Sequence, residues 1–536
     1  MNLKACAVLL SLSASAVAAE LPNDGFAGLE KLGAVIGVVH VDTRNIFDPT
    51  HPEETYALYG WVNRAHVVTR PAVIERMLLF HSGEKVSRQK INETERLLRT
   101  LRIIHDVEIK PTRYEDGVVD IEVITRDTWS LDLGGSFSRA GGQNKARVGI
   151  RERNLLGTGI GLSYGRSSDA DRSGNELELA YNQALDGWTR LFFGRGRFSD
   201  GRRTAYEIDR PFYSLDTRWA ARGAWTDDSR IDPIYNAGNV VSEYRHHSRA
   251  ADVFAGWSPG LVKNWTSRFL AGALVRDDSY AVEPGRVLAF PLPIDHEVRA
   301  PFVRYELLED EFVKVTNYNR IQRPEFLGLG FASYLQLARS LAAGSTPSEW
   351  LYAAGASDGK TFHSGSKLLG RATIERRIGS TATALTQGSL TTQLYVPWRS
   401  DALFYAGASA DHVSGGGVAD ELLLGGDTGL RGYPSRYQSG QNRVLLSAEQ
   451  RIYSNWYPLR LARVGGAVFF DTGRAWRGVN PNLENGGWLS DVGVGLRLAL
   501  DRSAFDNVLH VDLAVPLNRT PEIKAVQFLV KTYVSF

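Results

Sequence analysis

Cysteine is almost absent from this sequence, since the one cysteine among 536 residues is Cys6. Cys6 lies in an apolar stretch that follows Lys4 and closes in small residues, the pattern of a secretory signal peptide with cleavage after Ala18 or Ala19. We therefore expect residues 1–19 to be removed, and the mature chain to fold outside the cytoplasm without disulfides.

Long hydrophobic runs are also absent beyond that segment. No later stretch approaches the roughly 18 consecutive apolar residues that a membrane-spanning helix requires. Two possibilities remain for the mature chain. Either it is soluble, or it crosses a membrane as a closed β-barrel, the other fold that satisfies every backbone group in lipid.

A charge excess of either sign is missing as well. The 62 Lys and Arg residues nearly balance the 60 Asp and Glu residues, for a net charge of +2. Such a balance lacks the basic signature of polyanion binding, so we expect no nucleic-acid partner. Because 43% of the residues are hydrophobic, wholesale disorder is excluded too.

Residues 20–127 mix strand and helix patterns. We expect a strand over 35–41, helices beginning near Pro71 and Ser87, and strands over 106–110 and 119–123. This β-α-α-β-β order predicts one α+β domain. Residues 48–66 contain prolines and little periodicity, which indicates a loop or insertion within it.

Residues 128–536 show hardly a helical pattern, and their clearest segments alternate between apolar and small or polar residues. In residues 492–500 the apolar positions alternate with Gly493, Gly495 and Arg497. The final segment places its apolar residues largely on one face. These terminal-strand residues include Phe528, Val530, Val534 and Phe536.

A soluble β-sandwich would also alternate, but several features favour a barrel. Segments of about ten residues, glycine-rich polar faces and aromatic residues at strand ends are typical of transmembrane barrels. We therefore predict a membrane all-β fold, an antiparallel transmembrane β-barrel over 128–536. The segment count allows up to 20 strands.

Three motifs identify a possible family. Arg431-Gly432-Tyr433 ends a glycine-rich segment, Glu449 follows Ser447-Ala448, and Phe469-x-Asp471-x-Gly473 lies further on. Together with the N-terminal domain and the terminal Phe536, they resemble the outer-membrane assembly superfamily of BamA and TamA, also called the bacterial surface antigen family.

The resemblance implies a POTRA domain in the periplasm and a barrel of 16 strands in the bacterial outer membrane. It also implies that the loop with Arg431, Gly432 and Tyr433 folds back into the lumen, where Arg431 meets Glu449 and Asp471. Carboxylates can satisfy the planar donor fork of a confined guanidinium. Alternatively, Arg431 lies in an exposed hairpin and Asp471 begins a turn, or the contact is a structural brace only.

No motif points to catalysis or to a cofactor. Gly161-Leu162-Ser163-Tyr164-Gly165 matches a nucleophile elbow, but no helix pattern follows it. His246 and His247 are adjacent on an expected strand and would face opposite sides, so we expect no metal site there. We predict a protein without enzymatic activity, cofactor or metal.

The function that we expect is assistance in inserting proteins into the outer membrane or translocating them across it, through a POTRA domain and a lateral barrel seam. The first strand, near Trp129 to Gly135, would close against 527–536 at this seam. Expected partners are outer-membrane lipid, unfolded outer-membrane or secreted client proteins, and periplasmic accessory proteins. The alternatives are a dedicated secretion pore, a lipid conduit, or a passive porin or surface antigen.

Overall fold

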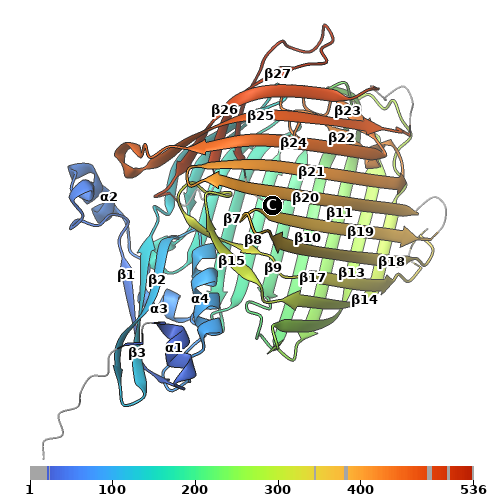
Figure 1. Cartoon of the computed structure of the whole chain (residues 1–536). Helices are drawn as coiled ribbons and strands as arrows, with labels where there is room; N and C mark the ends of the chain where they lie inside the picture. The colour runs from blue at the N-terminus through green and yellow to red at the C-terminus, as the bar shows by residue number, and fades with distance from the viewer. Residues whose placement is uncertain are drawn as a thin grey trace, which may run out of the picture.

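The computed structural model consists of an N-terminal α+β domain and a large closed barrel (Figure 1). It describes residues 21–22, 24–342, 344, 346–379, 384–479, 486–503 and 508–533. The expected signal peptide and the terminal residues Val534 and Phe536 lie outside these ranges. Within them, every α-helix precedes residue 101, and no helix is long and apolar enough to cross a bilayer.

The N-terminal domain is a three-stranded sheet covered by short helices. Its middle strand β3 runs parallel to β1 and antiparallel to β2. Helix α4 begins after Ser87, whose hydroxyl accepts a hydrogen bond from the Lys90 amide and caps the helix. The core lies between the sheet and the helices and includes Ile36, Leu98 and Val119. The elements are α1 (Phe26–Lys31), β1 (Val35–Arg44), α3 (Pro71–Glu75), α4 (Arg88–Thr100), β2 (Ile104–Glu115) and β3 (Val118–Asp127).

The segment 48–66, expected as a loop or insertion, contains a short 3₁₀ turn η1 (Pro52–Glu54) and helix α2 (Ala57–Ala65). Tyr59 of α2 packs on Phe47 in a small cluster of its own, which also contacts Trp129 and Leu461. This segment therefore joins the domain to the barrel and contributes nothing to the domain core.

The barrel is a closed antiparallel sheet of twenty strands, with the two-residue β12 (Leu261–Val262) added beside β13. The segment count reached this number, whereas the 16 strands implied by the resemblance are not found. The strands are β4 (Leu131–Ala140), β5 (Gln143–Glu152), β6 (Ile160–Ser168), β7 (Ser173–Ala184), β8 (Thr189–Phe198), β9 (Gly201–Arg210), β10 (Trp219–Asn236), β11 (Asn239–Trp257), β13 (Trp265–Ala281), β14 (His296–Glu309), β17 (Ala332–Arg339), β18 (Trp350–Thr361), β19 (Lys367–Ile378), β20 (Leu385–Arg399), β21 (Ala402–Gly415), β24 (Asn442–Tyr453), β25 (Ala462–Trp476), β26 (Leu489–Leu500), β27 (Val508–Pro516) and β28 (Gln527–Tyr533).

The two faces of the barrel wall differ in polarity, as the sequence alternation predicts. On β26, Val492, Val494 and Leu496 are exposed on the outer face, whereas Asp491 and Arg497 are buried on the inner face. The outer face is therefore apolar and the interior polar, which is the pattern of a barrel that sits in lipid.

The barrel closes between its last strand β28 and its first strand β4. Among the described residues this closure has a single register pair, Val530 with Arg139. The neighbouring pair β27 and β28 is in register all the way from Val508 opposite Tyr533 to Ala514 opposite Gln527. The closure is thus much less extensively paired than the strands beside it.

The N-terminal domain covers one open end of the barrel, where it contacts several of the turns between strands (Figure 1). The hydroxyl of Tyr59 donates to the carbonyl of Leu459 at 2.8 Å, and Arg502 donates to Glu54 at 2.6 Å. Further contacts join Asn154 to Thr69, Gln183 to Val73, Leu215 to Glu93, and Arg323 to His105.

Candidate functional site

The loop between β21 and β24 turns back into the barrel and places the Arg431-Gly432-Tyr433 motif against the inner wall. A small hairpin of β22 (Leu422–Leu424) and β23 (Gln438–Gly440) forms its base. Leu430 and Tyr433 of the loop are fully buried with Ala475 of β25 and Leu489 of β26. Apolar packing therefore fixes the loop on both sides of Arg431.

The Arg431 side chain is 4% exposed, and its guanidinium meets two carboxylates of the wall. Its Nε and Nη2 donate to the two oxygens of Asp471 at 2.6 and 2.9 Å, and its Nη1 donates to Glu449 at 2.6 Å. The guanidinium carbon also lies 3.4 Å from the centre of the Phe469 ring. The structure thus brings together the motif residues of three separate segments, and the two-pronged contact matches the donor fork of arginine.

The network extends beyond the residues identified from the sequence. Asp512 of β27 lies 3.4 Å from Nη1 of Arg431 and also accepts from Arg497 of β26. Arg451 donates to the second oxygen of Glu449 at 2.7 Å. Asp512 stands between apolar residues in the sequence, but the strand register that brings β27 near Arg431 is not readable from one sequence.

Asp491 of β26 holds the backbone of the motif. Its carboxylate accepts a hydrogen bond from the Gly432 amide at 3.0 Å. A Cβ at Gly432 would lie 2.6 Å from the Cβ of Asp491, so the loop can approach the wall only with glycine at this position. Close approach to the wall is the reason for glycine here, since Gly432 is not among the residues with a positive φ.

Tyr433 and Gly473 complete the placement of the motif residues. The Tyr433 hydroxyl donates to the carbonyl of Ser490 at 2.8 Å and accepts from the Ser490 amide, so it bonds to the backbone of β26. Gly473 lies on β25 beside the β22 residue Leu424, where a Cβ would come within 2.6 Å of the Val444 carbonyl. Of the terminal-strand residues, Phe528 is exposed on the outer face and Val530 forms the closing pair.

A chamber of about 1440 Å³, lined by both charged and apolar side chains, lies inside the barrel beside the loop. Its walls include Glu449, Arg451 and Arg497 of the network, and its opposite boundary includes Arg96 and Arg99 of α4. The N-terminal domain and the Arg431 loop therefore bound the same internal space from two sides.

A second inward element, missed by the sequence reasoning, lies between β14 and β17. It is a hairpin of β15 (Phe312–Thr316) and β16 (Pro324–Gly328), which also lines the chamber. At its tip Tyr318 packs with Tyr395, Leu403 and Tyr453 of distant strands. Asn317 has φ of 66°, and an asparagine-rich turn between two short apolar runs was the available signal.

The hairpin also contacts the N-terminal domain. Lys314 donates to Glu95 of α4 at 2.8 Å, and the Arg96 guanidinium lies 3.5 Å from the centre of the Phe312 ring. The hairpin and α4 therefore form one continuous boundary at this end of the barrel.

The residues set aside as catalytic or metal-binding candidates have ordinary partners. Ser163 lies on β6 and accepts a hydrogen bond from Arg147 at 2.9 Å. His246 contacts Asp232 and Asp278, whereas His247 contacts Asp227 on the other face of β11. In the portion of the chain that the structure describes, no group of three or more His, Cys, Asp or Glu residues is arranged to hold a metal ion.

Comparisons with known proteins find structural likeness only, since neither a protein-family model nor a curated protein matches this sequence. BamA from Haemophilus ducreyi lacking POTRA domains 1–3 is 13% identical, with a TM-score of 0.40 over 93% of this chain and 85% of that chain. CdiB from Acinetobacter baumannii is 12% identical, with a TM-score of 0.45 over 93% and 74%. CdiB from Escherichia coli is 13% identical, with a TM-score of 0.47 over 94% and 76%.

Proposed function

We propose that this chain is a bacterial outer-membrane barrel that helps to insert other proteins into that membrane or to move them across it. Its N-terminal domain acts as a POTRA domain in the periplasm, and its partners are outer-membrane lipid, unfolded client proteins and periplasmic accessory proteins. The work is done by binding and strand pairing, without covalent catalysis, cofactor or nucleotide.

The observation that carries this proposal is the burial of Arg431 among Glu449, Asp471 and Asp512. Burying a guanidinium costs several kcal/mol unless carboxylates and hydrogen bonds compensate. Here β24, β25 and β27 each supply one carboxylate to a loop that enters from the far end of the barrel. An exposed extracellular hairpin needs no such arrangement. A barrel wall whose strands are joined by these ion pairs can keep its shape while the β4–β28 pair opens.

Two further features support strand exchange with a client. The closure between β28 and β4 has one register pair among the described residues, so few ladder bonds need to break for it to open. In the N-terminal domain, β1 and β2 are the outer strands of the sheet and can accept an incoming strand by β-augmentation. The first contact and the insertion step would then use the same backbone chemistry.

The proposal is tested by locking the closure. Paired cysteines at Arg139→Cys and Val530→Cys are specific because Cys6, within the expected signal peptide, is the only native cysteine. The matched control, Val511→Cys with Val530→Cys, cross-links the neighbouring β27 and β28 pair instead. The assay is the outer-membrane proteome of cells depleted of the native protein and supplied with either variant.

We expect the β4–β28 cross-link to abolish rescue and a reducing agent to restore it, whereas the β27–β28 control rescues throughout. Full rescue with a locked closure would remove the lateral mechanism. A mature protein that stays folded and monomeric in buffer without detergent would contradict the membrane placement itself.

A further inference from the structure

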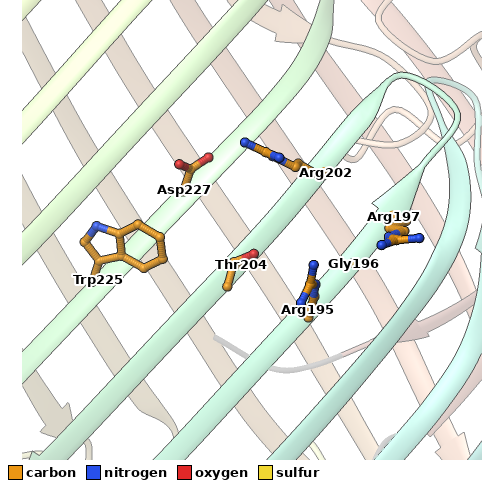
Figure 2. A pocket seen from close by; sticks show the side chains of 7 residues that line it. All are labelled: Arg195, Gly196, Arg197, Arg202, Thr204, Trp225 and Asp227. Atoms are coloured by element: carbon orange, nitrogen blue, oxygen red, sulfur yellow. The ribbon is translucent and has the colours of Figure 1, made fainter.

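The outer face of the barrel carries a group of arginines at the end remote from the N-terminal domain. Arg195 and Arg197 lie on β8 and Arg202 lies on β9, beside the short turn that joins these strands. All three are exposed, and Figure 2 shows them on the same side of the wall as Trp225. They occupy the face that carries Leu191 further down β8, so they continue the outer apolar face of the barrel.

These arginines face each other across the strands. Arg197 is directly opposite Arg202, and Arg195 is opposite Thr204. The same row continues through Asn175 of β7 to Arg166 of β6, which is also exposed. Like charges directly opposite in a sheet destabilise it, unless an anion lies between them.

Among the residues that the structure describes, no carboxylate forms an ion pair with Arg195, Arg197 or Arg202. In the described part of the chain, Arg195, Arg197 and Arg202 take part in no ion pair or side-chain hydrogen bond. The neighbouring Asp227 is 3.3 Å from Arg249 and 3.1 Å from His247, so it is already engaged on its other side. The group is therefore a concentrated positive site with open donors.

An aromatic row lies directly next to the arginines. The ring centres of Phe193 and Tyr206 are 5.2 Å apart, and those of Tyr206 and Trp225 are 5.7 Å apart. Tyrosine and tryptophan on the outside of a membrane protein mark the boundary between headgroups and acyl chains. The arginines therefore lie on the headgroup side of that boundary.

The shape of the wall adds a recess. Strands β8 and β9 have 10 residues each, whereas the adjoining β10 and β11 have 18 and 19 and continue well past them. A hollow of about 170 Å³ lies between the arginines, Thr204, Trp225 and Asp227 (Figure 2). A headgroup bound here would be flanked by the taller wall of β10.

We infer that this face, defined by Arg166, Arg195, Arg197 and Arg202, binds the phosphate groups of a lipid in the outer leaflet. Guanidinium groups bind phosphate oxygens in pairs, and the acyl chains of the same lipid would lie on Phe193, Tyr206 and Trp225. A free phosphate ion would satisfy the arginines but leave the aromatic row unused, so the geometry favours the lipid. The inference rests on the proposed placement of the barrel in the outer membrane.

The test uses the full mature chain in nanodiscs of phosphatidylcholine that contain a small fraction of lipid A, a bis-phosphorylated glycolipid. Native mass spectrometry counts the lipid A retained after transfer to detergent, and dephosphorylated lipid A provides the second arm. The variant is Arg195→Gln with Arg197→Gln and Arg202→Gln. The matched control removes three outward arginines elsewhere, Arg299→Gln, Arg339→Gln and Arg376→Gln.

We expect the native chain and the control to retain the phosphorylated lipid, and the triple variant to bind it about a hundredfold more weakly. Equal retention by all three proteins, or of both lipids, would overturn the inference. So would calorimetry in which inorganic phosphate alone binds as tightly as the lipid. A chain that does not enter nanodiscs at all would refute both the membrane placement and the lipid site. A chain that enters nanodiscs but retains both lipids equally would refute the lipid site alone.

Discussion

Arg431 and Asp471, 40 residues apart in the sequence, face each other inside the barrel through two parallel hydrogen bonds of 2.6 and 2.9 Å. Arg431→Ala should leave Asp471, Glu449 and Asp512 as buried charges without their central cation. Breaking a buried pair in this way typically costs about 3–5 kcal/mol. The measurement is the temperature at which the barrel loses its heat-modifiable electrophoretic mobility. Arg431→Lys, which keeps the charge but not the donor fork, should fall between the alanine variant and the native protein, and an unchanged transition for Arg431→Ala would refute the anchoring role.

Gly432→Ala should displace the loop from the wall, because the new Cβ would lie 2.6 Å from the Cβ of Asp491. Overpacking of this kind costs about 1–3 kcal/mol. Gly417 in the same loop has open space around it, so Gly417→Ala is the matched control. Limited proteolysis of the loop should be faster for the first variant only. Equal cleavage of the two variants would mean that the approach to Asp491 is unimportant.

The N-terminal domain should lose stability in mild acid because of His105. Burial, and then the positive charge of Arg502, lower the pKa of His105 to about 3. Between pH of about 6.5 and 3 the unfolded chain binds a proton that the folded chain excludes, so the free energy of unfolding falls as pH falls, by at most about 1.4 kcal/mol per pH unit. Hydrogen exchange of residues 24–127 at several pH values measures this effect. His105→Gln should flatten the dependence, whereas His81→Gln, which changes an exposed histidine, should leave it intact.

Removing the β15–β16 hairpin should open the lower boundary of the chamber. Replacing residues 312–328 by a short turn removes Tyr318 and the contacts of Lys314 and Phe312 with α4. Ion conductance in planar bilayers should then rise above that of the native chain. A second variant replaces the hairpin by Gly and Ser residues of the same length. It tests whether any chain segment of that length blocks ions or whether the packing of Tyr318 is needed. Unchanged conductance in both variants would show that the hairpin is not the barrier.

Much of the barrel could be predicted from local pattern. The alternation of Val492, Val494 and Leu496 with glycine and Arg497 indicates one apolar face, and the structure places that face outside. Counting such segments allows up to 20 strands, and the structure has that number in the barrel wall. The sequence resemblance pointed to a smaller number, because a family likeness carried by motifs around Arg431 and Asp471 contains no information about the earlier strands.

The rest depended on contacts between distant segments. Asp491 and Asp512 approach the Arg431 loop only because β26 and β27 adopt a particular register beside β25. The β15–β16 hairpin packs inward because Tyr318 meets Tyr395 from another strand, and no local signal encodes that meeting. Arg431 and its partners Glu449 and Asp471 were identified through the resemblance, whereas the additional partners Asp491 and Asp512 required three-dimensional placement.

The N-terminal domain touches turns spread around the mouth of the barrel, from Gly157 to Arg502. Each of these hydrogen bonds contributes little binding free energy by itself. Because all of them join the same domain to the barrel, a contact that breaks re-forms at a high effective concentration while the others hold. Release of the domain should therefore be concerted. A single surface substitution would leave the domain bound to the barrel. Only a ligand that competes for several of the turns at once would release it.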